Sequence, residues 1–262
     1  MTNAFIQQTR DIIEQLYGSE ITKLFPNYSV FWEEFIGDPK KDIPVAYGLT
    51  FPSDIAAEKQ GAIEKIYDEI CMAHYSLFCH LAGTHFQLEN MKRISKLDDF
   101  KRKYFEHWET FEVCYIHLGS AFYQMYHLWG LILLLRNEVT RDKRGRFQPS
   151  IKTKLKDYLK NLSQDTLCEK IDKLDEEIKN LRDNIVHFSR VASEVHFGEF
   201  YIPKMIEPEA WKKQHEKEEW LETSKKIRTD LDETEKLINS IHNFLIREYR
   251  DFLTTNKMKI NS

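Results

Sequence analysis

Hydrophobic residues recur at intervals of three and four positions over most of the chain, and this spacing is typical of amphipathic α-helices. The sequence of 262 residues contains only nine Gly and seven Pro residues, so long helices can run without interruption. In the main part of the chain the pattern predicts long helices over about 54–94, 97–135 and 208–253, with shorter ones over 150–162 and from Thr166 onward. We therefore predict an all-α fold.

The first 53 residues differ from the rest of the chain. Asn3–Tyr17 has a helical pattern that Gly18 ends, and the residues from Ser19 to Ser53 carry no helical period. This second stretch is rich in aromatic residues and is interrupted by four prolines: Pro26, Pro39, Pro44 and Pro52. We predict that residues 1–53 form an N-terminal helix and an ordered loop that packs on the body of the protein, with a lid as the alternative.

The helical body is predicted to extend over residues 54–255. Within it, residues 193–206 alternate between apolar and polar side chains, so they could form a small hairpin that turns at Gly198, or a loop. The polar residues 256–262 are predicted to form a frayed tail.

The predicted helix over 97–135 is the most apolar of the set. No charged side chain occurs between Val113 and Leu135, and this length suffices to span a bilayer. Tyrosine, histidine, serine and glutamine side chains are nevertheless scattered along it, and their burial in lipid is costly. We interpret this helix as the centre of a bundle and expect no membrane association. Its large aromatic residues are interpreted as core packing rather than as a platform for stacked bases: Phe122, Tyr126 and Trp129.

The composition is typical of a soluble globular protein. Charged residues make up 31% of the chain and hydrophobic residues 42%, and the formal net charge of −4 leaves room for a basic surface only as a local feature. The N-terminus shows no signal peptide, so we predict a cytoplasmic protein. The four cysteines form no CxxC pair and are interpreted as reduced thiols: Cys71, Cys79, Cys114 and Cys168.

A group of histidines and cysteines in the predicted helix 54–94 raises the question of a metal site. Helical zinc ligands usually stand four positions apart with a carboxylate nearby, whereas His80 lies six positions after His74 and five before His85. We interpret His74 and His85 as buried histidines with hydrogen-bond partners. We predict neither a metal nor a cofactor.

The most basic stretch of the chain follows the predicted helix 97–135. Between residues 136 and 160, nine basic side chains outnumber three acidic ones, and Gly145 and Pro149 mark its first half as a loop. One interpretation is a solvated loop, and the other is a surface that guides an RNA backbone. The second interpretation assigns RNA binding to the arginines and the lysine of the loop: Arg141, Lys143, Arg144 and Arg146.

The helix predicted from Thr166 onward has a regular seam of apolar residues. Thr166 and Glu169 have the spacing of a capping box at its start. The seam consists of Leu167, Ile171, Leu174, Ile178, Leu181, Ile185 and Phe188.

Four polar residues stand together late in this helix: Arg182, Asp183, Asn184 and His187. The planar guanidinium of Arg182 is suited to a phosphate, and His187 can take or give a proton near neutral pH. An anion-binding group next to a proton carrier is what phosphodiester chemistry needs.

This arrangement resembles the signature of the HEPN superfamily, which is an Arg followed by four to six residues and a His, often with Asn, Asp or His directly after the Arg. The resemblance covers roughly residues 55–255 and rests on the motif and its helical surroundings. It implies a bundle of long antiparallel helices that forms a homodimer. It also implies a metal-independent endoribonuclease of toxin–antitoxin or antiphage systems, with RNA as substrate and an antitoxin or another regulatory protein as partner.

The same spacing occurs at two other places in the chain. Arg102 and His107 form one match, and Arg190 and His196 form the other. Their second residues are Lys103 and Val191, so neither match has the polar second residue, which Asp183 provides in the main motif.

Helical geometry constrains how the motif can work. Arg182 and His187 are five positions apart, which is about 140° around an ideal helix. One straight helix therefore brings them together poorly, whereas two such helices that meet across a twofold axis place both pairs in one cleft. A local break near Asn184 is the alternative.

The resemblance implies a role for each motif residue. His187 acts as general base on the ribose 2′-hydroxyl or as general acid on the leaving 5′-oxygen, and Arg182 binds the scissile phosphate. Asp183 orients one of these two side chains, and Asn184 contributes an amide. Two other functions stay open: a non-catalytic HEPN-type module that binds nucleotide, RNA or protein, and a helical interaction protein in which the motif has no catalytic role.

Overall fold

A computed structural model describes residues 49–94, 96, 100–180 and 218–260. Their fold is all-α, as predicted. The helices are α4 (Ala57–Ile94), α5 (Phe100–Leu135), α6 (Ile151–Asn161), a helix over residues 165–180 and α9 (Glu218–Thr255). Four two-residue strands accompany them: β1 (Leu49–Thr50), β2 (Thr140–Arg141), β3 (Phe147–Gln148) and β4 (Lys259–Ile260).

The predicted helices of the body agree with these bounds to within a few residues. Helix α4 begins at Ala57 and α5 at Phe100, each three residues later than predicted. The predicted N-terminal helix, nearly all of the loop that follows it, the 193–206 segment and residues 208–217 of the last predicted helix lie outside the described residues.

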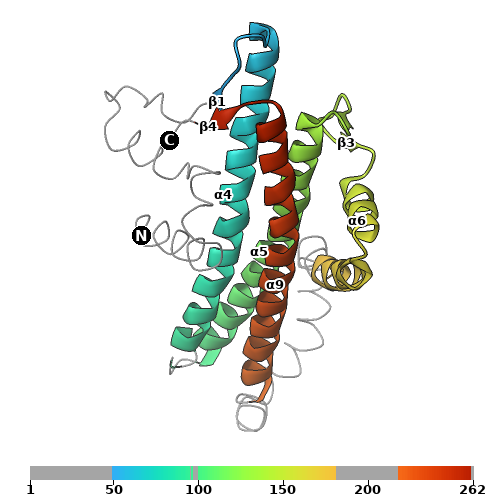
Figure 1. The fold of residues 1–262 in the computed structure, drawn as a ribbon. Coiled ribbons are helices and arrows are strands. Elements are labelled where there is room, and N and C mark those ends of the chain that lie inside the picture. The colour runs from blue at the N-terminus through green and yellow to red at the C-terminus, as the bar shows by residue number, and fades with distance from the viewer. Residues whose placement is uncertain (1–48, 95, 97–99, 181–217, 261–262) are drawn as a thin grey trace, which may run out of the picture. The chain divides into compact units, whose positions relative to one another are not determined.

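The chain divides into two compact units, and the three long helices contribute to both. The described part of the first unit comprises residues 49–82, 121–168 and 238–260. Here the start of α4 and the end of α9 run antiparallel, and β1 before α4 pairs with β4 after α9 (Figure 1). Further along the same two helices, the imidazole rings of His74 and His242 are joined by a hydrogen bond.

The pairing of β1 with β4 corrects the prediction for the C-terminal tail. Leu49 lies opposite Ile260 and Thr50 opposite Lys259 in an antiparallel ladder. The tail was predicted to fray from residue 256, but residues 256–260 make a turn and a strand. The mostly polar side chains of this segment do not indicate the ladder, since its hydrogen bonds come from the backbone, but Met258 within it is buried.

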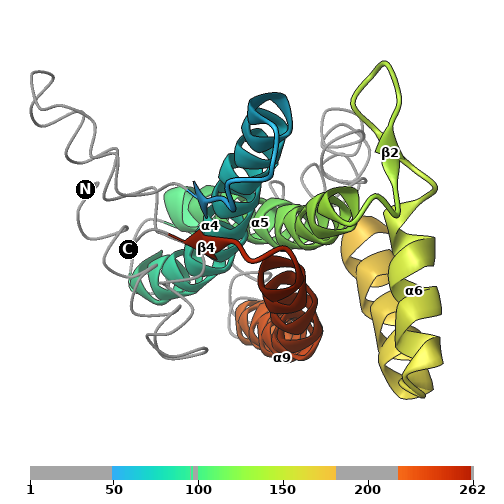
Figure 2. The ribbon, with the colours of Figure 1, turned by 45° about the horizontal axis from the view of Figure 1, so that its top comes forward.

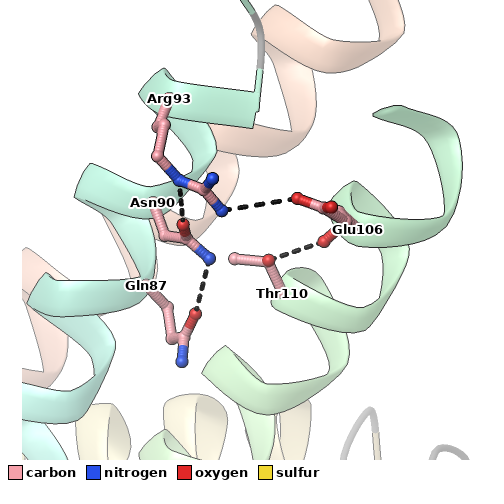
Figure 3. A network of polar contacts seen from close by, with 5 residues as sticks. All are labelled: Gln87, Asn90, Arg93, Glu106 and Thr110. Carbon is pink, nitrogen blue, oxygen red and sulfur yellow. Dashed lines mark hydrogen bonds and ion pairs between the residues drawn. The ribbon is translucent and has the colours of Figure 1, made fainter. Parts of the chain in front are cut away.

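The described part of the second unit comprises residues 83–94, 96, 100–120, 169–180 and 218–237. Helix α4 runs antiparallel to α5, because Gly83 lies against the His117 ring and the guanidinium of Arg93 lies 3.4 Å from the Glu106 carboxylate (Figure 3). A Cβ at Gly83 would come within 2.7 Å of the imidazole, so this glycine permits the close approach of the two helices.

Helix α9 completes the second unit. His85 of α4 binds Glu235 of α9 at 2.6 Å, and Met91 of α4 accepts a hydrogen bond from Ser224 of α9 at 3.6 Å. As the residue numbers rise along α4 they fall along α9, so these two helices are antiparallel here as well.

The apolar seam predicted for the helix over 165–180 is confirmed as far as the described residues extend. Ile171, Leu174 and Ile178 are buried, and Leu167 is partly buried. The predicted capping box differs from the structure, because the backbone N–H groups of residues 167 and 168 donate to the carbonyl of Gln164. Gln164 therefore precedes the first turn, and Thr166 lies inside it.

One helix of the described residues, over Glu109–Leu135, is long and apolar enough to cross a membrane by length and composition. In its most apolar part, 67% of the segment is buried inside the protein. This burial agrees with the interpretation of α5 as a core helix.

Candidate functional site

The predicted catalytic residues Arg182, Asp183, Asn184 and His187 lie outside the described residues. The helix that leads to them is described up to residue 180. The part of the predicted site that the structure describes is therefore the basic stretch between α5 and α6.

This stretch forms a β-hairpin rather than the predicted loop. Strand β2 pairs with β3, with Thr140 opposite Gln148 and Arg141 opposite Phe147 (Figure 2). We call residues 140–148 the basic hairpin, and its connecting residues 142–146 the tip.

The conformation of the tip is determined by Asp142 and Gly145. The Asp142 carboxylate accepts hydrogen bonds from the backbone N–H groups of Arg144 at 2.8 Å and Arg146 at 2.9 Å. Gly145 has a φ of 76°, which is the left-handed region that a residue with a Cβ enters at a cost. These bonds hold the pKa of Asp142 below its ordinary value, so the carboxylate stays ionised and keeps accepting them.

Arg141 attaches the base of the hairpin to α4. Its guanidinium donates two hydrogen bonds to the Glu69 carboxylate, at 3.3 and 2.6 Å, and lies 4.9 Å from the centre of the Phe147 ring. The hydrogen bond from Arg141 is the main reason why the pKa of Glu69 lies below its ordinary value. Of the four predicted RNA-binding residues, Arg141 therefore has a structural role, because its guanidinium binds Glu69 and anchors the hairpin to α4.

Phe147 attaches the hairpin to α5. A Cβ at Gly130 would lie 2.6 Å from the Phe147 ring, so the absence of a side chain at Gly130 lets the ring lie against the helix backbone. The His127 ring lies 5.5 Å from the Phe147 ring. Burial, and next the charge of Arg141, lower the pKa of His127, so this imidazole is neutral near pH 7.

The tip presents the other three predicted residues to solvent. Arg146 is exposed and pairs with Asp142 at 2.8 Å. Lys143 and Arg144 are exposed and make no ion pair with any of the described residues. The two cations are thus available for an anionic ligand.

Helix α6 extends this positive charge along the chain. From residue 141 to 160, eight Lys and Arg residues stand against two Asp residues. The helix buries Ile151, Leu155 and Leu159, so its lysines lie on the remaining faces. Tyr158 fastens α6 to α9 through hydrogen bonds with Glu248 at 2.6 Å and Arg247 at 2.7 Å.

The aromatic residues of α5 divide between core and surface. Phe122 and Trp129 are buried, which confirms their interpretation as core packing, and Tyr126 is partly buried. Tyr123 was not singled out from the sequence, yet 61% of it is exposed. Its ring stacks on His127, one helical turn away, with an interplanar angle of 9° and 6.1 Å between ring centres.

Two histidines link α4 to α9 within the first unit. His74 is buried, and its Nε2 lies 3.0 Å from Nε2 of His242, which is buried as well. This confirms that His74 is a buried histidine with a hydrogen-bond partner. Burial lowers the pKa of both rings, that of His242 to about 3, so both are neutral and one donates its proton to the other.

The expectation for His85 holds in part. It has a hydrogen-bond partner in Glu235, but 33% of its side chain is exposed. Apolar spacing along α4 therefore does not distinguish a fully buried position from one at the margin of the core.

A second buried polar group lies in the second unit and was not predicted. The Tyr115 hydroxyl donates to the Asp230 carboxylate at 2.5 Å, and Lys226 lies 3.1 Å from the same oxygen. Burial, reinforced by Asp230, raises the pKa of Tyr115, so the phenol stays neutral and serves as a donor. This group joins α5 to α9.

No cluster of three or more His, Cys, Asp or Glu side chains suited to a metal ion is found in the described part of the chain. The four cysteines are free thiols, and burial raises the pKa of Cys71 and Cys114 to about 12. Comparison with protein-family models, with curated proteins and with solved structures finds no match to this chain.

Proposed function

We propose that this protein is a metal-independent endoribonuclease of HEPN type. The observation that carries the proposal is the sequence Arg182-Asp183-Asn184 with His187, which follows in the chain a described helix whose seam is buried at Ile171, Leu174 and Ile178. The seam residues Leu181 and Ile185 keep the same spacing through the motif. The exposed cations of the basic hairpin support RNA as the substrate.

In this proposal the reaction is an attack of the ribose 2′-oxygen on the adjacent phosphorus. The bond from phosphorus to the 5′-oxygen breaks, and the products are a 2′,3′-cyclic phosphate and a 5′-hydroxyl. His187 removes the proton of the 2′-hydroxyl or protonates the leaving 5′-oxygen. Arg182 neutralises the charge that develops on the phosphate, with Asp183 and Asn184 holding the two side chains in place.

The proposal includes a homodimer, because an Arg and a His about 140° apart on one straight helix reach the same phosphate poorly. Two chains related by a twofold axis can each supply one of the two side chains to a shared cleft. A regulatory protein that occupies this cleft or separates the two chains would suppress the activity, as an antitoxin does.

The test is cleavage of a mixed RNA pool in the presence of EDTA. Wild type is expected to leave cyclic phosphate ends, while His187→Ala loses about 100- to 10,000-fold in rate and Arg182→Ala about 100- to 1,000-fold. Arg190→Ala and His196→Ala are the matched controls, because Arg190 and His196 have nearly the spacing of Arg182 and His187 but Arg190 is followed by Val191. Both variants should cleave like wild type. Undiminished cleavage by His187→Ala, with the fold intact by circular dichroism, contradicts the proposal.

A mixing experiment tests the shared site. Arg182→Ala and His187→Ala chains, each inactive alone, form mixed dimers in which one cleft keeps an Arg from one chain and a His from the other. Partial recovery of cleavage on mixing supports a site built from two chains. No recovery, with mixed dimers demonstrated, places both residues of a working site in one chain.

The second candidate function is an RNA-binding module without turnover. The exposed Lys143 and Arg144 favour it, because a cationic surface binds RNA whether or not the motif is catalytic. This candidate predicts RNA binding by the wild type with no cleavage of any substrate. The absence of both binding and cleavage would instead favour a helical interaction protein.

A further inference from the structure

Tyr123 is the most exposed of the large hydrophobic side chains in the described part of the chain. An exposed tyrosine ring needs support on one side if it is to offer its other side to a ligand in a fixed orientation. The His127 ring lies nearly parallel to it, at an interplanar angle of 9° with 6.1 Å between ring centres, and limits its movement from one side. Since His127 is neutral, it backs the ring without adding a charge.

The ring of Tyr123 is connected to the basic hairpin by a continuous series of contacts. His127 touches both Tyr123, at 6.1 Å between ring centres, and Phe147, at 5.5 Å. Phe147 directly follows the tip in the chain, and the Arg141 guanidinium lies over its ring. All of these residues belong to the first unit. The exposed ring is therefore linked, through His127 and Phe147, to the hairpin whose tip carries the exposed cations.

We propose that Tyr123 and the tip of the basic hairpin form a binding surface for single-stranded RNA, in which an unpaired base stacks on Tyr123 and phosphates contact Lys143 and Arg144. The proposal takes RNA as the class of ligand from the proposed function, and it adds a defined place and manner of binding. It assigns Tyr123 and His127 to substrate binding, and neither belongs to the catalytic motif.

The chemistry of the surface favours an unpaired strand. A base can stack on a side chain only when it is not enclosed in a duplex, and such a contact is worth about 1–3 kcal/mol per base. The cations contact the backbone regardless of sequence. Met72 is 54% exposed and lies one helical turn after Glu69, and an exposed methionine of this kind could contact an apolar side chain of a protein partner. The hairpin and α6 carry eight basic and two acidic residues over 141–160, and this excess of positive charge favours a polyanion instead.

The experiment measures binding without cleavage. A fluorescent single-stranded oligoribonucleotide with 2′-O-methyl riboses keeps the bases and phosphates but lacks the 2′-hydroxyl that a ribonuclease of this kind needs. Its affinity is measured by anisotropy at several salt concentrations for wild type, Tyr123→Ala, Tyr123→Phe, Phe86→Ala and the double variant Lys143→Ala with Arg144→Ala. A duplex of the same modified strand serves as the comparison ligand.

Each set of variants has its own expected signature. Tyr123→Ala weakens binding of the single strand about 5- to 150-fold and leaves the salt dependence unchanged, because the lost contact is uncharged. Tyr123→Phe binds like wild type, since it keeps the ring. The double variant reduces the slope of log affinity against log salt by about 0.7 for each lost phosphate contact. Phe86→Ala, which removes an exposed aromatic ring from the second unit, leaves binding unchanged.

Several outcomes would overturn the inference. Equal affinity of wild type and Tyr123→Ala would show that no base stacks on Tyr123. An unchanged salt slope in the double variant would show that Lys143 and Arg144 do not contact phosphates. Failure of wild type to bind the oligoribonucleotide removes the site altogether and leaves a protein partner as the occupant. These results are separate from the proposed function, because Tyr123-dependent binding can occur without cleavage, and cleavage can occur without Tyr123-dependent binding.

Discussion

The base and the tip of the basic hairpin contain the same kind of side chain in different surroundings. At the base, Arg141 lies 2.6 Å from the Glu69 carboxylate and over the Phe147 ring, with 26% of its side chain exposed. Two to five residues further on, Lys143, Arg144 and Arg146 extend from the tip into solvent. A run of basic residues is therefore not one functional unit. Some of its charges hold the structure and others are free to bind.

The largest effect on stability is expected from Arg141→Ala. The substitution removes a charge-assisted pair of hydrogen bonds and leaves the half-buried Glu69 without its main partner, for a loss of about 2–3 kcal/mol in the free energy of unfolding. Urea denaturation measures this loss. Arg144→Ala is the matched control, an exposed arginine three residues away, and should change the free energy by less than about 0.5 kcal/mol. Equal effects of the two variants would contradict the distinction between base and tip.

A smaller loss is expected from Gly130→Ala. An alanine in a helix interior is favoured over glycine by about 1 kcal/mol. Here its Cβ meets the Phe147 ring at 2.6 Å, and overpacking costs about 1–3 kcal/mol, so the net change is a loss of up to about 2 kcal/mol. Gly61→Ala is the control, because a Cβ at that exposed position of α4 meets nothing within 4 Å. Thermal unfolding should show Gly61→Ala more stable than wild type and Gly130→Ala less stable.

The pair at the base also predicts a dependence on pH. The folded-state pKa of Glu69 is below its ordinary value of 4.5, so its contribution to stability is present above about pH 4.5 and is lost as the pH falls through the folded-state pKa. Glu69→Gln lacks this contribution at every pH. The difference in free energy of unfolding between wild type and Glu69→Gln should therefore be largest near neutral pH and shrink in acid. A difference that stays constant down to about pH 3 would contradict this.

The smallest effect on stability is expected at the tip. Lys143→Ala combined with Arg144→Ala removes two exposed cations that pair with none of the described acidic residues, so the free energy of unfolding should change by less than about 0.5 kcal/mol. The same double variant should bind RNA more weakly. A large loss of stability in this variant would show that the tip, like the base, holds the fold.

Several parts of the structure could be predicted because they depend on local periodicity. The bounds of α4, α5 and α6, the buried seam at Ile171, Leu174 and Ile178, and the core positions of Phe122 and Trp129 follow from the spacing of apolar side chains. The frayed tail follows from the mostly polar side chains of residues 256–262, and two apolar residues among them, Met258 and Ile260, are too few to predict the β1–β4 ladder.

Of the basic hairpin, the sequence predicts only that basic residues gather there, and not which of them bind other parts of the fold. The sequence was enough to predict that this chain forms long helices and that its basic residues gather between 136 and 160, and it places Arg182 and His187 five positions apart. The tertiary structure decided that Arg141 pairs with Glu69, 72 positions away, that His74 meets His242, 168 positions away, and that Tyr123 points to solvent. The reason is physical: periodicity along one segment fixes which face of a helix is buried, but the partner of a polar side chain depends on which distant segment the fold brings beside it.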